Sequence, residues 1–279
     1  MQFWKVQASG NDFVLIDGRE KKQSTSAYKT LTKKVCDRKF GIGADGLLVV
    51  ESSKKADCRM RIFNADGSEA EMCGNGARCF AFWVTKHIVK KQKIAFTFET
   101  LAGIICAEVD LGAKPSNSCK VKIGLSDPKG LALDAKVKVG KDTLPVDFVN
   151  TGVPHAVIFV KDIEKVDVKG VGAAVRYHKH FAPAGTNVNF VQATSPDAIL
   201  IRTYERGVEE ETLSCGTGTC AASIITALRL QGERDMYRMS ITARSGEVLK
   251  VDFTKDEQGT HVDVWMQGTA YEVFSGTFA

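Results

Sequence analysis

The sequence predicts an α/β protein of two pseudo-symmetric domains, each a curved, mostly antiparallel sheet wrapped around a central buried helix. Three observations predict this class. Much of the 279-residue chain falls into short runs that alternate between apolar and polar residues, as strands do. Two other segments are apolar on nearly every helical face, which is typical of a buried helix. Both of these segments follow the same short motif, Cys-Gly-x-Gly.

The strands are predicted first by alternation. Residues 59–63, 120–123, 136–139 and 250–253 place an apolar side chain at every second position. Runs rich in β-branched and aromatic residues, bounded by turn residues, add further strands. These lie at 12–17, 47–51, 95–100, 104–111, 156–160, 188–192, 199–205, 240–243, 261–266 and 271–274.

The two central helices follow the cysteine motifs. After Cys73, the residues Ala77, Phe80, Val84 and Ile88 repeat at helical spacing, and after Cys215 a similar stripe starts at Cys220. Two lesser helices are predicted near 27–38 and 171–179.

The repeat of strands, glycine turn and buried helix divides the chain into two halves. We assign residues 1–117 plus 269–279 to the first half and 118–268 to the second, with a linker at 112–118 that contains Pro115. The mirrored halves predict an active site in the cleft between them.

Composition excludes several classes of protein. Hydrophobic residues make up 44% and charged residues 25% of the chain, as in ordinary globular proteins. The net charge of +5 is spread along the chain, which argues against a nucleic-acid partner. Neither a signal peptide nor a membrane-spanning run is visible, so we expect a cytoplasmic protein with no membrane partner and with reduced cysteines.

Metal and dinucleotide sites are not predicted. The eight cysteines form no Cys-x-x-Cys pair, and His178-x-His180 has no matching partner, so we expect no metal and no cofactor. Residues 41–46 fit the dinucleotide pattern G-x-G-x-x-G. That loop must follow a strand and open a helix, whereas here it follows a predicted helix and precedes a strand. A tight turn is expected instead.

The Cys-Gly-x-Gly turn suggests chemistry at a helix start. Glycines allow the backbone to approach a ligand and to adopt dihedral angles closed to other residues. The N–H groups of the first turn bind an anion such as an α-carboxylate, and their field favours a cysteine thiolate. Two such turns facing each other would let Cys73 and Cys215 remove and deliver a proton at one carbon. The other six cysteines are interpreted as packing residues.

Several motifs resemble diaminopimelate epimerase, in order over essentially the whole chain. They lie at 9–13, 41–46, 63–69, 73–79, 151–155, 187–190 and 204–220. The resemblance implies two pseudo-symmetric α/β domains and a cofactor-independent enzyme that interconverts LL- and meso-diaminopimelate. That reaction belongs to lysine and peptidoglycan precursor biosynthesis.

The resemblance also implies residue roles. Cys73 and Cys215 are the acid–base pair, and His155 and Glu205 support or tune them. The reacting carboxylate is bound by the backbone of Gly74, Asn75, Gly216 and Thr217, and the remaining substrate groups by Asn11, Asn64, Asn187, Glu205 and Arg206. As partners, we expect the amino-acid substrate and a second copy of the chain in a homodimer.

Two positions depart from the pattern of the family, and two alternative functions remain open. Gly46 stands where some relatives have glutamine, and Val153 where many have asparagine, so contacts to the distal end of the substrate are expected to differ. The rival enzyme is a racemase of the same superfamily acting on another amino acid, such as proline or histidine. The rival of another class is a non-catalytic binding or structural relative, which would need no second cysteine.

Overall fold

The chain folds into two compact units. The structure, a computed structural model, describes residues 1–20, 22–113, 116–256 and 258–279. Unit 1 comprises Met1–Ile123 and Gln267–Ala279, and unit 2 comprises Gly124–Met266. The boundary predicted at 117/118 falls just before β8 (Ser118–Gly124), which pairs with β7 (Gly103–Asp110) and so remains with unit 1. Residues 114–115 of the predicted linker lie outside the described part.

Unit 1 is a sheet that closes on itself. Neighbouring strands pair in the order β1, β2, β3, β4, β6, β7, β8 and β17, and β17 pairs with β1 again. The β2–β3 and β4–β6 pairs are parallel, whereas the other pairs with a described register are antiparallel. Besides β7 and β8, the strands are β1 (Gln2–Ala8), β2 (Asn11–Asp17), β3 (Gly46–Glu51), β4 (Cys58–Asn64), β5 (Glu69–Ala70), β6 (Lys93–Thr100) and β17 (His261–Thr277), which belongs to this unit from Gln267 onward.

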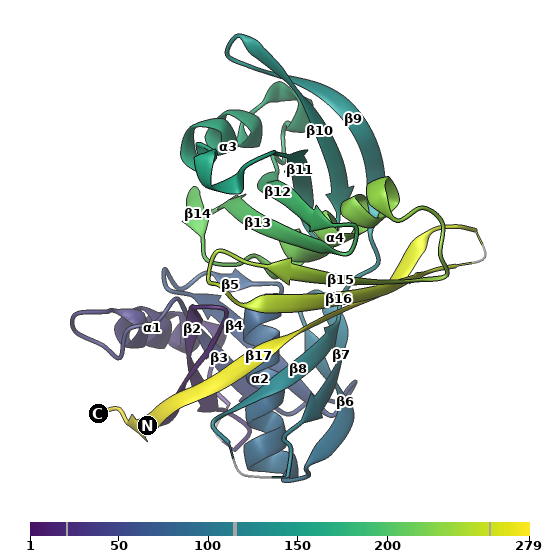
Figure 1. The fold of residues 1–279 in the computed structure, drawn as a ribbon. Coiled ribbons are helices and arrows are strands. Elements are labelled where there is room, and N and C mark those ends of the chain that lie inside the picture. The colour runs from purple at the N-terminus through teal and green to yellow at the C-terminus, as the bar shows by residue number, and fades with distance from the viewer. Residues whose placement is uncertain (21, 114–115, 257) are drawn as a thin grey trace. The chain divides into compact units, whose positions relative to one another are not determined.

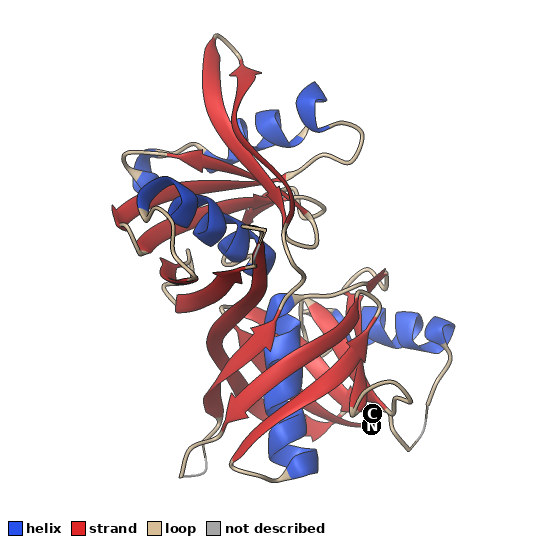
Figure 2. Ribbon diagram, turned by 90° about the vertical axis from the view of Figure 1, so that its right-hand side faces the viewer, coloured by secondary structure: helices blue, strands red, loops and turns tan. Residues whose placement is uncertain are grey.

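Helix α2 (Gly74–Val84) runs through this closed sheet. All of its 11 residues are buried, including Arg78 and the aromatic side chains of Phe80 and Trp83. A π-helical turn, Thr85–Val89, extends it. Figures 1 and 2 show the strands of unit 1 surrounding α2. The apolar surface on every side of this helix, read from the sequence, is therefore explained by its enclosure.

Helix α1 (Thr25–Cys36) lies outside the closed sheet. Ser24 caps its N-terminus by accepting a hydrogen bond from the Ala27 N–H. Its buried Tyr28 and Val35 belong to a cluster that includes Val14 and Leu47 of the sheet. The 41–46 segment then leads from α1 to β3, with Gly43 at φ +79°, so the predicted turn is confirmed and the dinucleotide reading stays excluded.

Unit 2 repeats this order of elements. The series β10, β11, α3, β12, β13, β14, α4, β15, β16 follows the pattern of β1, β2, α1, β3, β4, β5, α2, β6, β7. Its parallel pairs, β11–β12 and β13–β15, correspond to β2–β3 and β4–β6. The elements are β9 (Lys129–Val139), β10 (Asp142–Asn150), β11 (Pro154–Phe159), α3 (Val168–Arg176), β12 (Asn187–Ser195), β13 (Ala198–Glu205), β14 (Glu210–Thr212), α4 (Gly216–Leu230), β15 (Met236–Thr242) and β16 (Val248–Lys255), with 3₁₀ turns at Ile163–Lys165 and Lys179–Phe181.

The predicted helices and most predicted strands are present, but the prediction lacks the short strands β5 and β14 as well as β1 and β10, and it divides β17. Strand β10 is absent from the prediction, and it contains Pro145, which cannot donate a ladder hydrogen bond. Pro145 pairs only with Lys136 of β9, because the β11 pairing begins at Asp147. The strands predicted at 261–266 and 271–274 are one continuous strand, β17, since the intervening residues remain extended.

Candidate active site

Cys73 lies at the N-cap of the central helix of unit 1. Its backbone is extended (φ −143°, ψ 122°), and its sulfur accepts a hydrogen bond from the Gly76 N–H at 3.5 Å. The Cys73 thiol also donates to Oδ1 of Asn11, 3.6 Å away on β2. A half-buried thiol therefore sits at the positive end of a buried helix, beside an amide side chain.

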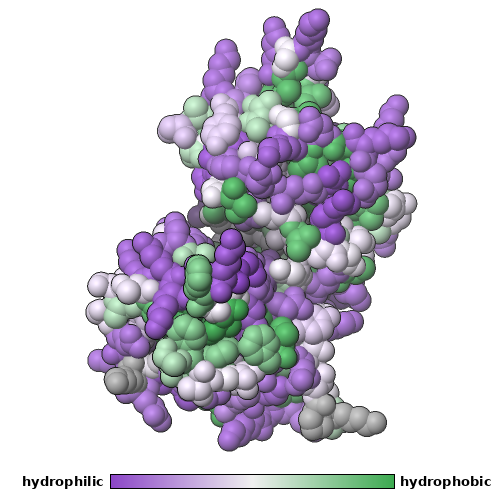
Figure 3. Space-filling view, turned by 90° about the vertical axis from the view of Figure 1, so that its left-hand side faces the viewer, coloured by the Kyte–Doolittle hydropathy of each residue, from purple (hydrophilic) through white to green (hydrophobic). Residues whose placement is uncertain are grey.

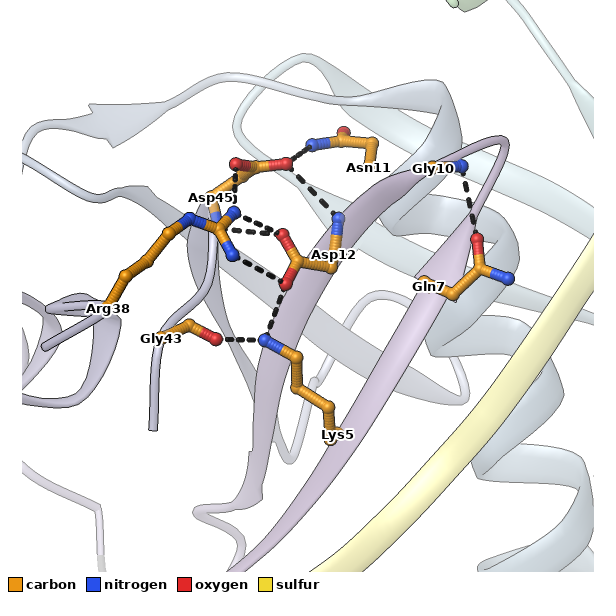
Figure 4. Close-up of polar contacts among 8 residues, drawn as sticks. All are labelled: Lys5, Gln7, Gly10, Asn11, Asp12, Arg38, Gly43 and Asp45. Carbon is orange, nitrogen blue, oxygen red and sulfur yellow. Dashed lines mark hydrogen bonds and ion pairs between the residues drawn. The ribbon is translucent and has the colours of Figure 1, made fainter. Parts of the chain in front are cut away.

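A group of charged residues holds Asn11 in place (Figure 4). The Asn11 amide donates to Oδ2 of Asp45 at 2.8 Å. Arg38 bridges Asp45 and Asp12 at 2.7 Å each, and Lys5 pairs with the other oxygen of Asp12 at 2.5 Å. Although burial alone would raise it, hydrogen bonds and charge from Arg38 and Lys5 lower the pKa of Asp12 to about 2.

The other residues implied for unit 1 occupy two environments. Asn75 is buried in the first turn of α2, and its Oδ1 accepts a hydrogen bond from Arg78 at 2.6 Å. Asn64 is exposed at the end of β4, opposite Gly46, and its amide donates to Ser68 Oγ at 3.0 Å. A side chain at Gly46 would meet the Phe63 carbonyl at 2.6 Å, so glutamine does not fit this backbone.

Cys215 occupies the equivalent position in unit 2. It is the N-cap of α4, with an extended backbone (φ −118°, ψ 111°), and its side chain makes no capping hydrogen bond. Its sulfur lies 3.6 Å from the Thr217 hydroxyl, which is 2.9 Å from Nε2 of His155. His155 is fully buried on β11, and burial, with the charge of Arg206, lowers its pKa to about 3. The imidazole is therefore neutral at pH 7.

The residues implied for the rest of the substrate lie near one another in unit 2. Asn187, at the start of β12, accepts from the Arg206 N–H at 2.9 Å and donates to the Pro154 carbonyl at 3.0 Å. Glu205 immediately precedes Arg206, and burial raises its pKa above the ordinary value. The Arg206 guanidinium donates to the Ala184 carbonyl at 3.0 Å. Val153 is half-buried in the turn before β11.

The structure corrects the role expected of the motif glycines. All four lie within α2 or α4, and none has a positive φ, so no closed dihedral region is used. Packing instead leaves little space for a side chain at Gly76 and none at Gly218. A Cβ at Gly76 would come 3.1 Å from Ile62 and 3.3 Å from Leu48, and one at Gly218 would overlap Oδ1 of Asn189.

The packing interpretation of the other six cysteines holds for five. Cys36, Cys58 and Cys119 are buried, and burial raises the pKa of each to about 12. Cys79 and Cys220 are also buried, within the central helices. Cys106 is the exception, because it occupies an outward position of the alternating strand β7 and is exposed.

Sequence reasoning missed several residues of these surroundings. The charged group of unit 1, made of Lys5, Asp12, Arg38 and Asp45, was not singled out, although Asp12 and Asp45 lie in the quoted motifs. In unit 2, Asn189 also lies in a quoted motif, two positions after Asn187. A second asparagine at that spacing on one strand faces the same side, and this was the available signal.

Among the described residues, no group of three or more His, Cys, Asp or Glu side chains is arranged to hold a metal ion. His178 instead caps the 3₁₀ turn by accepting from the His180 N–H at 3.2 Å. Within the same described ranges, none of the helices has the length and apolar character needed to cross a membrane.

Comparison with known proteins identifies full-length relatives. The family model for diaminopimelate epimerase matches residues 3–124 and 148–272. A diaminopimelate epimerase of Aquifex aeolicus is 43% identical, with 99% of this chain and 97% of that protein covered. Another, of Elusimicrobium minutum, is 42% identical, with 100% and 99% covered.

Solved structures share the fold at low identity. A phenazine biosynthesis protein of the PhzF family from Bacillus anthracis has a TM-score of 0.77 at 18% identity, covering 100% of this chain and 99% of that one. A probable proline racemase from Agrobacterium radiobacter has a TM-score of 0.73 at 15% identity, covering 100% and 92%. At this identity the likeness concerns the fold alone.

Proposed function

Because the chain belongs to the diaminopimelate epimerase family, we propose that it inverts one α-carbon of LL-diaminopimelate to give the meso isomer, in lysine and peptidoglycan precursor biosynthesis. One structural observation supports the proposal independently of the family relationship. Each unit places a cysteine at the N-cap of its central buried helix, and the two cysteines occupy equivalent positions of a repeated series of elements. A reaction with one acid and one base requires two such groups.

The reacting carboxylate is bound, in this proposal, by helix starts. The first-turn N–H groups of α2 and α4 have no carbonyl four residues earlier within the helix, and they carry partial positive charge. The backbone of Gly74, Asn75, Gly216 and Thr217 supplies these donors. They also stabilise the negative charge that builds on the carboxylate oxygens as the α-proton leaves.

Cys73 and Cys215 then exchange protons with the α-carbon. One sulfur, as thiolate, removes the α-proton, and the carbon is left as a carbanion conjugated with its carboxylate. The other sulfur, as thiol, delivers its own proton to the opposite face and becomes the thiolate. Charge and protons balance, since one thiol and one thiolate remain. The mechanism requires the two sulfurs to reach one carbon from opposite sides.

The remaining groups set substrate choice. We assign Arg206 to the distal carboxylate, which a guanidinium binds bidentately, and Asn11, Asn64, Asn187 and Glu205 to the remaining polar groups. His155, neutral and buried beside Thr217, and Glu205, with its raised pKa, support the thiols. A substrate without the second carboxylate would leave Arg206 without its charged partner.

The test is incubation of the purified protein with LL-diaminopimelate and a panel of L-amino acids, including lysine, proline and histidine, followed by chiral chromatography. We expect rapid epimerisation of diaminopimelate and at least about a tenfold lower kcat/KM for lysine, since one charged hydrogen-bonded pair is lost. Equal turnover of lysine would remove the role of Arg206. Turnover of proline or histidine alone would favour the rival racemase. No turnover of any substrate would favour a non-catalytic relative.

We further propose that the protein acts in the cytoplasm as a homodimer. The thiols of Cys36, Cys58, Cys106 and Cys119 are free, as a reducing compartment requires. On the face shown in Figure 3, apolar side chains gather on unit 1 within a hydrophilic surround. Exposed large apolar residues of this unit include Phe40, Val273 and Phe274. Light scattering after size-exclusion chromatography measures the mass, and a monomer at micromolar concentration would contradict the dimer.

A further inference from the structure

Unit 2 contains a chain of buried polar side chains that ends at Cys215. It starts at Thr203 on β13, whose hydroxyl lies 3.0 Å from Oδ1 of Asn189 on β12. Asn189 Nδ2 lies 3.1 Å from Nδ1 of His155, and His155 Nε2 lies 2.9 Å from the Thr217 hydroxyl. Thr203, Asn189 and His155 are each at most 3% exposed.

The direction of each hydrogen bond in this chain follows from one carbonyl group. Asn189 Nδ2 also lies 3.0 Å from the backbone oxygen of Ala156, which can only accept. The NH₂ group of the Asn189 side chain must therefore face Ala156 and His155, and its oxygen must face Thr203. The two hydrogens of this NH₂ group serve the two acceptors, the Ala156 oxygen and His155 Nδ1.

The imidazole tautomer follows in turn. A neutral imidazole has one N–H, and a ring nitrogen that accepts from Asn189 cannot carry it. The hydrogen is on Nε2, and the imidazole donates it to Thr217 Oγ1. The Thr217 hydroxyl, having accepted, still has its own hydrogen, and Cys215 Sγ lies 3.6 Å away as its acceptor. A hydroxyl donor at this place favours the thiolate form of Cys215.

We propose that Asn189 is a positioning residue, which fixes His155 in the Nε2–H tautomer and so directs the Thr217 hydroxyl hydrogen toward Cys215. The proposal deepens the proposed function, since it assumes that Cys215 acts as a thiolate. Asn189 touches neither the thiol nor, in this proposal, the substrate.

The packing of the helix start supports the same role. A Cβ at Gly218 would overlap Oδ1 of Asn189 and lie 3.3 Å from His155 Cε1. The second glycine of the motif therefore leaves the space that the Asn189 side chain occupies beneath the first turn of α4. Arg206 is the charged group whose field acts on His155, and it opposes a second proton on the ring.

The tautomer can be measured directly in the wild-type protein. Nitrogen NMR of protein labelled with ¹⁵N-histidine distinguishes a protonated from an unprotonated ring nitrogen, and His155→Gln identifies the His155 signals among those of the five histidines. We expect Nε2 protonated and Nδ1 unprotonated at pH 7 to 8. This readout needs no turnover, so it remains valid if the substrate assignment fails.

Two variants connect the tautomer to catalysis. Asn189→Asp keeps the size of the side chain but replaces the donor with an acceptor, so the neutral imidazole should carry its hydrogen on Nδ1 and accept from Thr217. We expect kcat to fall about tenfold or more with KM nearly unchanged, and the acidic limb of the kcat profile to move to higher pH.

Thr203→Val is the matched control. It removes one hydrogen bond from the same buried side chain, yet the Ala156 carbonyl still fixes the Asn189 amide. It should lower the unfolding temperature while leaving the tautomer and the pH profile as in the wild type. If Asn189→Asp does not fold, the tautomer measured in the wild-type protein still decides, since it needs no variant of Asn189.

Three outcomes would overturn the proposal. The first is an Nδ1–H imidazole in the wild-type protein. The second is a folded Asn189→Asp variant with unchanged kcat and pH profile. The third is a Thr203→Val profile displaced as far as that of Asn189→Asp, since the effect would then come from packing rather than from the direction of the hydrogen bonds.

Discussion

His155 is a single residue whose protonation state is set by burial. Its side chain is fully buried, and burial, with the charge of Arg206, lowers its pKa from 6.5 to about 3. In the unfolded chain the same imidazole takes up a proton near pH 6.5. Because the folded state does not take up this proton, stability falls as the pH drops from 6.5 toward 3, by about 1.4 kcal/mol per pH unit.

We therefore predict that His155→Gln removes this part of the pH dependence. Between pH 7 and pH 5, the wild-type protein should lose about 2 kcal/mol more unfolding free energy than the variant. Urea unfolding at the two pH values measures the difference. His180→Gln, which changes an exposed histidine of the same unit, should keep the wild-type slope. Equal slopes for wild type and His155→Gln would contradict a neutral buried imidazole.

Single residues also show how far sequence reasoning reaches. Cys73 and Cys215 stand out because glycines and apolar helices follow both of them. The Asn189 contacts could not be predicted, because they depend on three strands and one helix start meeting in space. Cys106 was misjudged, since its exposure is decided by which face of β7 turns outward.

At the scale of elements, the starts of α2 and α4 differ in what packs against the second glycine of the motif. Gly218 leaves room for an Asn189 side chain anchored by hydrogen bonds, whereas Gly76 faces the flexible ends of Ile62 and Leu48. We predict that Gly218→Ala lowers the unfolding free energy by about 1–3 kcal/mol.

The equivalent change in unit 1 is the comparison. Alanine favours both helices over glycine by about 1 kcal/mol. Gly76→Ala should nevertheless cost less than Gly218→Ala, because the two methyl groups that face Gly76 can move slightly. Chemical denaturation of both variants gives the ranking. A larger loss of unfolding free energy for Gly76→Ala would show that contact with the Asn189 side chain is not the reason for glycine at position 218.

Strand β2, which contains Asn11, is held in place by partly buried ion pairs of Asp12. Asp12 joins the start of β2 to the α1–β3 loop through Arg38, and it pairs with the largely buried Lys5. Its pKa is lowered from 3.8 to about 2, so its contribution to stability is present above pH 3.8 and is lost as the pH falls toward 2.

We predict that Asp12→Asn costs about 1–3 kcal/mol at pH 7, because Lys5 is left without its carboxylate. Asp17→Asn is the matched control on the same strand. Asp17 pairs with the more exposed Arg19, so its replacement should cost less than about 1 kcal/mol. Thermal unfolding of both variants tests the order, and a more costly Asp17→Asn would refute it.

The secondary structure shows the same division between local and long-range information. Periodicity predicts α2, α4 and most strands, because a buried face leaves its period in the sequence. It does not predict β10, because a proline such as Pro145 usually argues against a strand. The end of β10 that contains Pro145 pairs with β9 alone, and there the proline is tolerated. Nor does it join the two parts of β17, because that continuity depends on pairing with β1 and β8.

At the scale of the whole molecule, the fold presents the same motif twice. Replacing either cysteine should abolish epimerisation, since neither sulfur can both remove and deliver the proton. The fold should survive both changes. Cys215 makes no capping hydrogen bond, and loss of the Cys73 cap should cost about 1 kcal/mol.

Assays of Cys73→Ala and Cys215→Ala, with circular dichroism to confirm folding, test this requirement. Cys106→Ala, at an exposed position of β7, is the control and should retain full activity. Substantial epimerisation by either of the first two variants would be incompatible with the two-thiol assignment.

The most direct test of the central claim is hydrogen exchange during turnover in deuterated water. A delivering thiol exchanges with solvent before substrate binds, so product formed early should carry deuterium at the inverted α-carbon. The abstracting sulfur returns the original proton to the face it came from, so recovered LL-diaminopimelate should carry almost none. Mass spectrometry of both isomers at low conversion gives the answer. Deuterium in both pools would show that a single base serves both faces and would contradict the account.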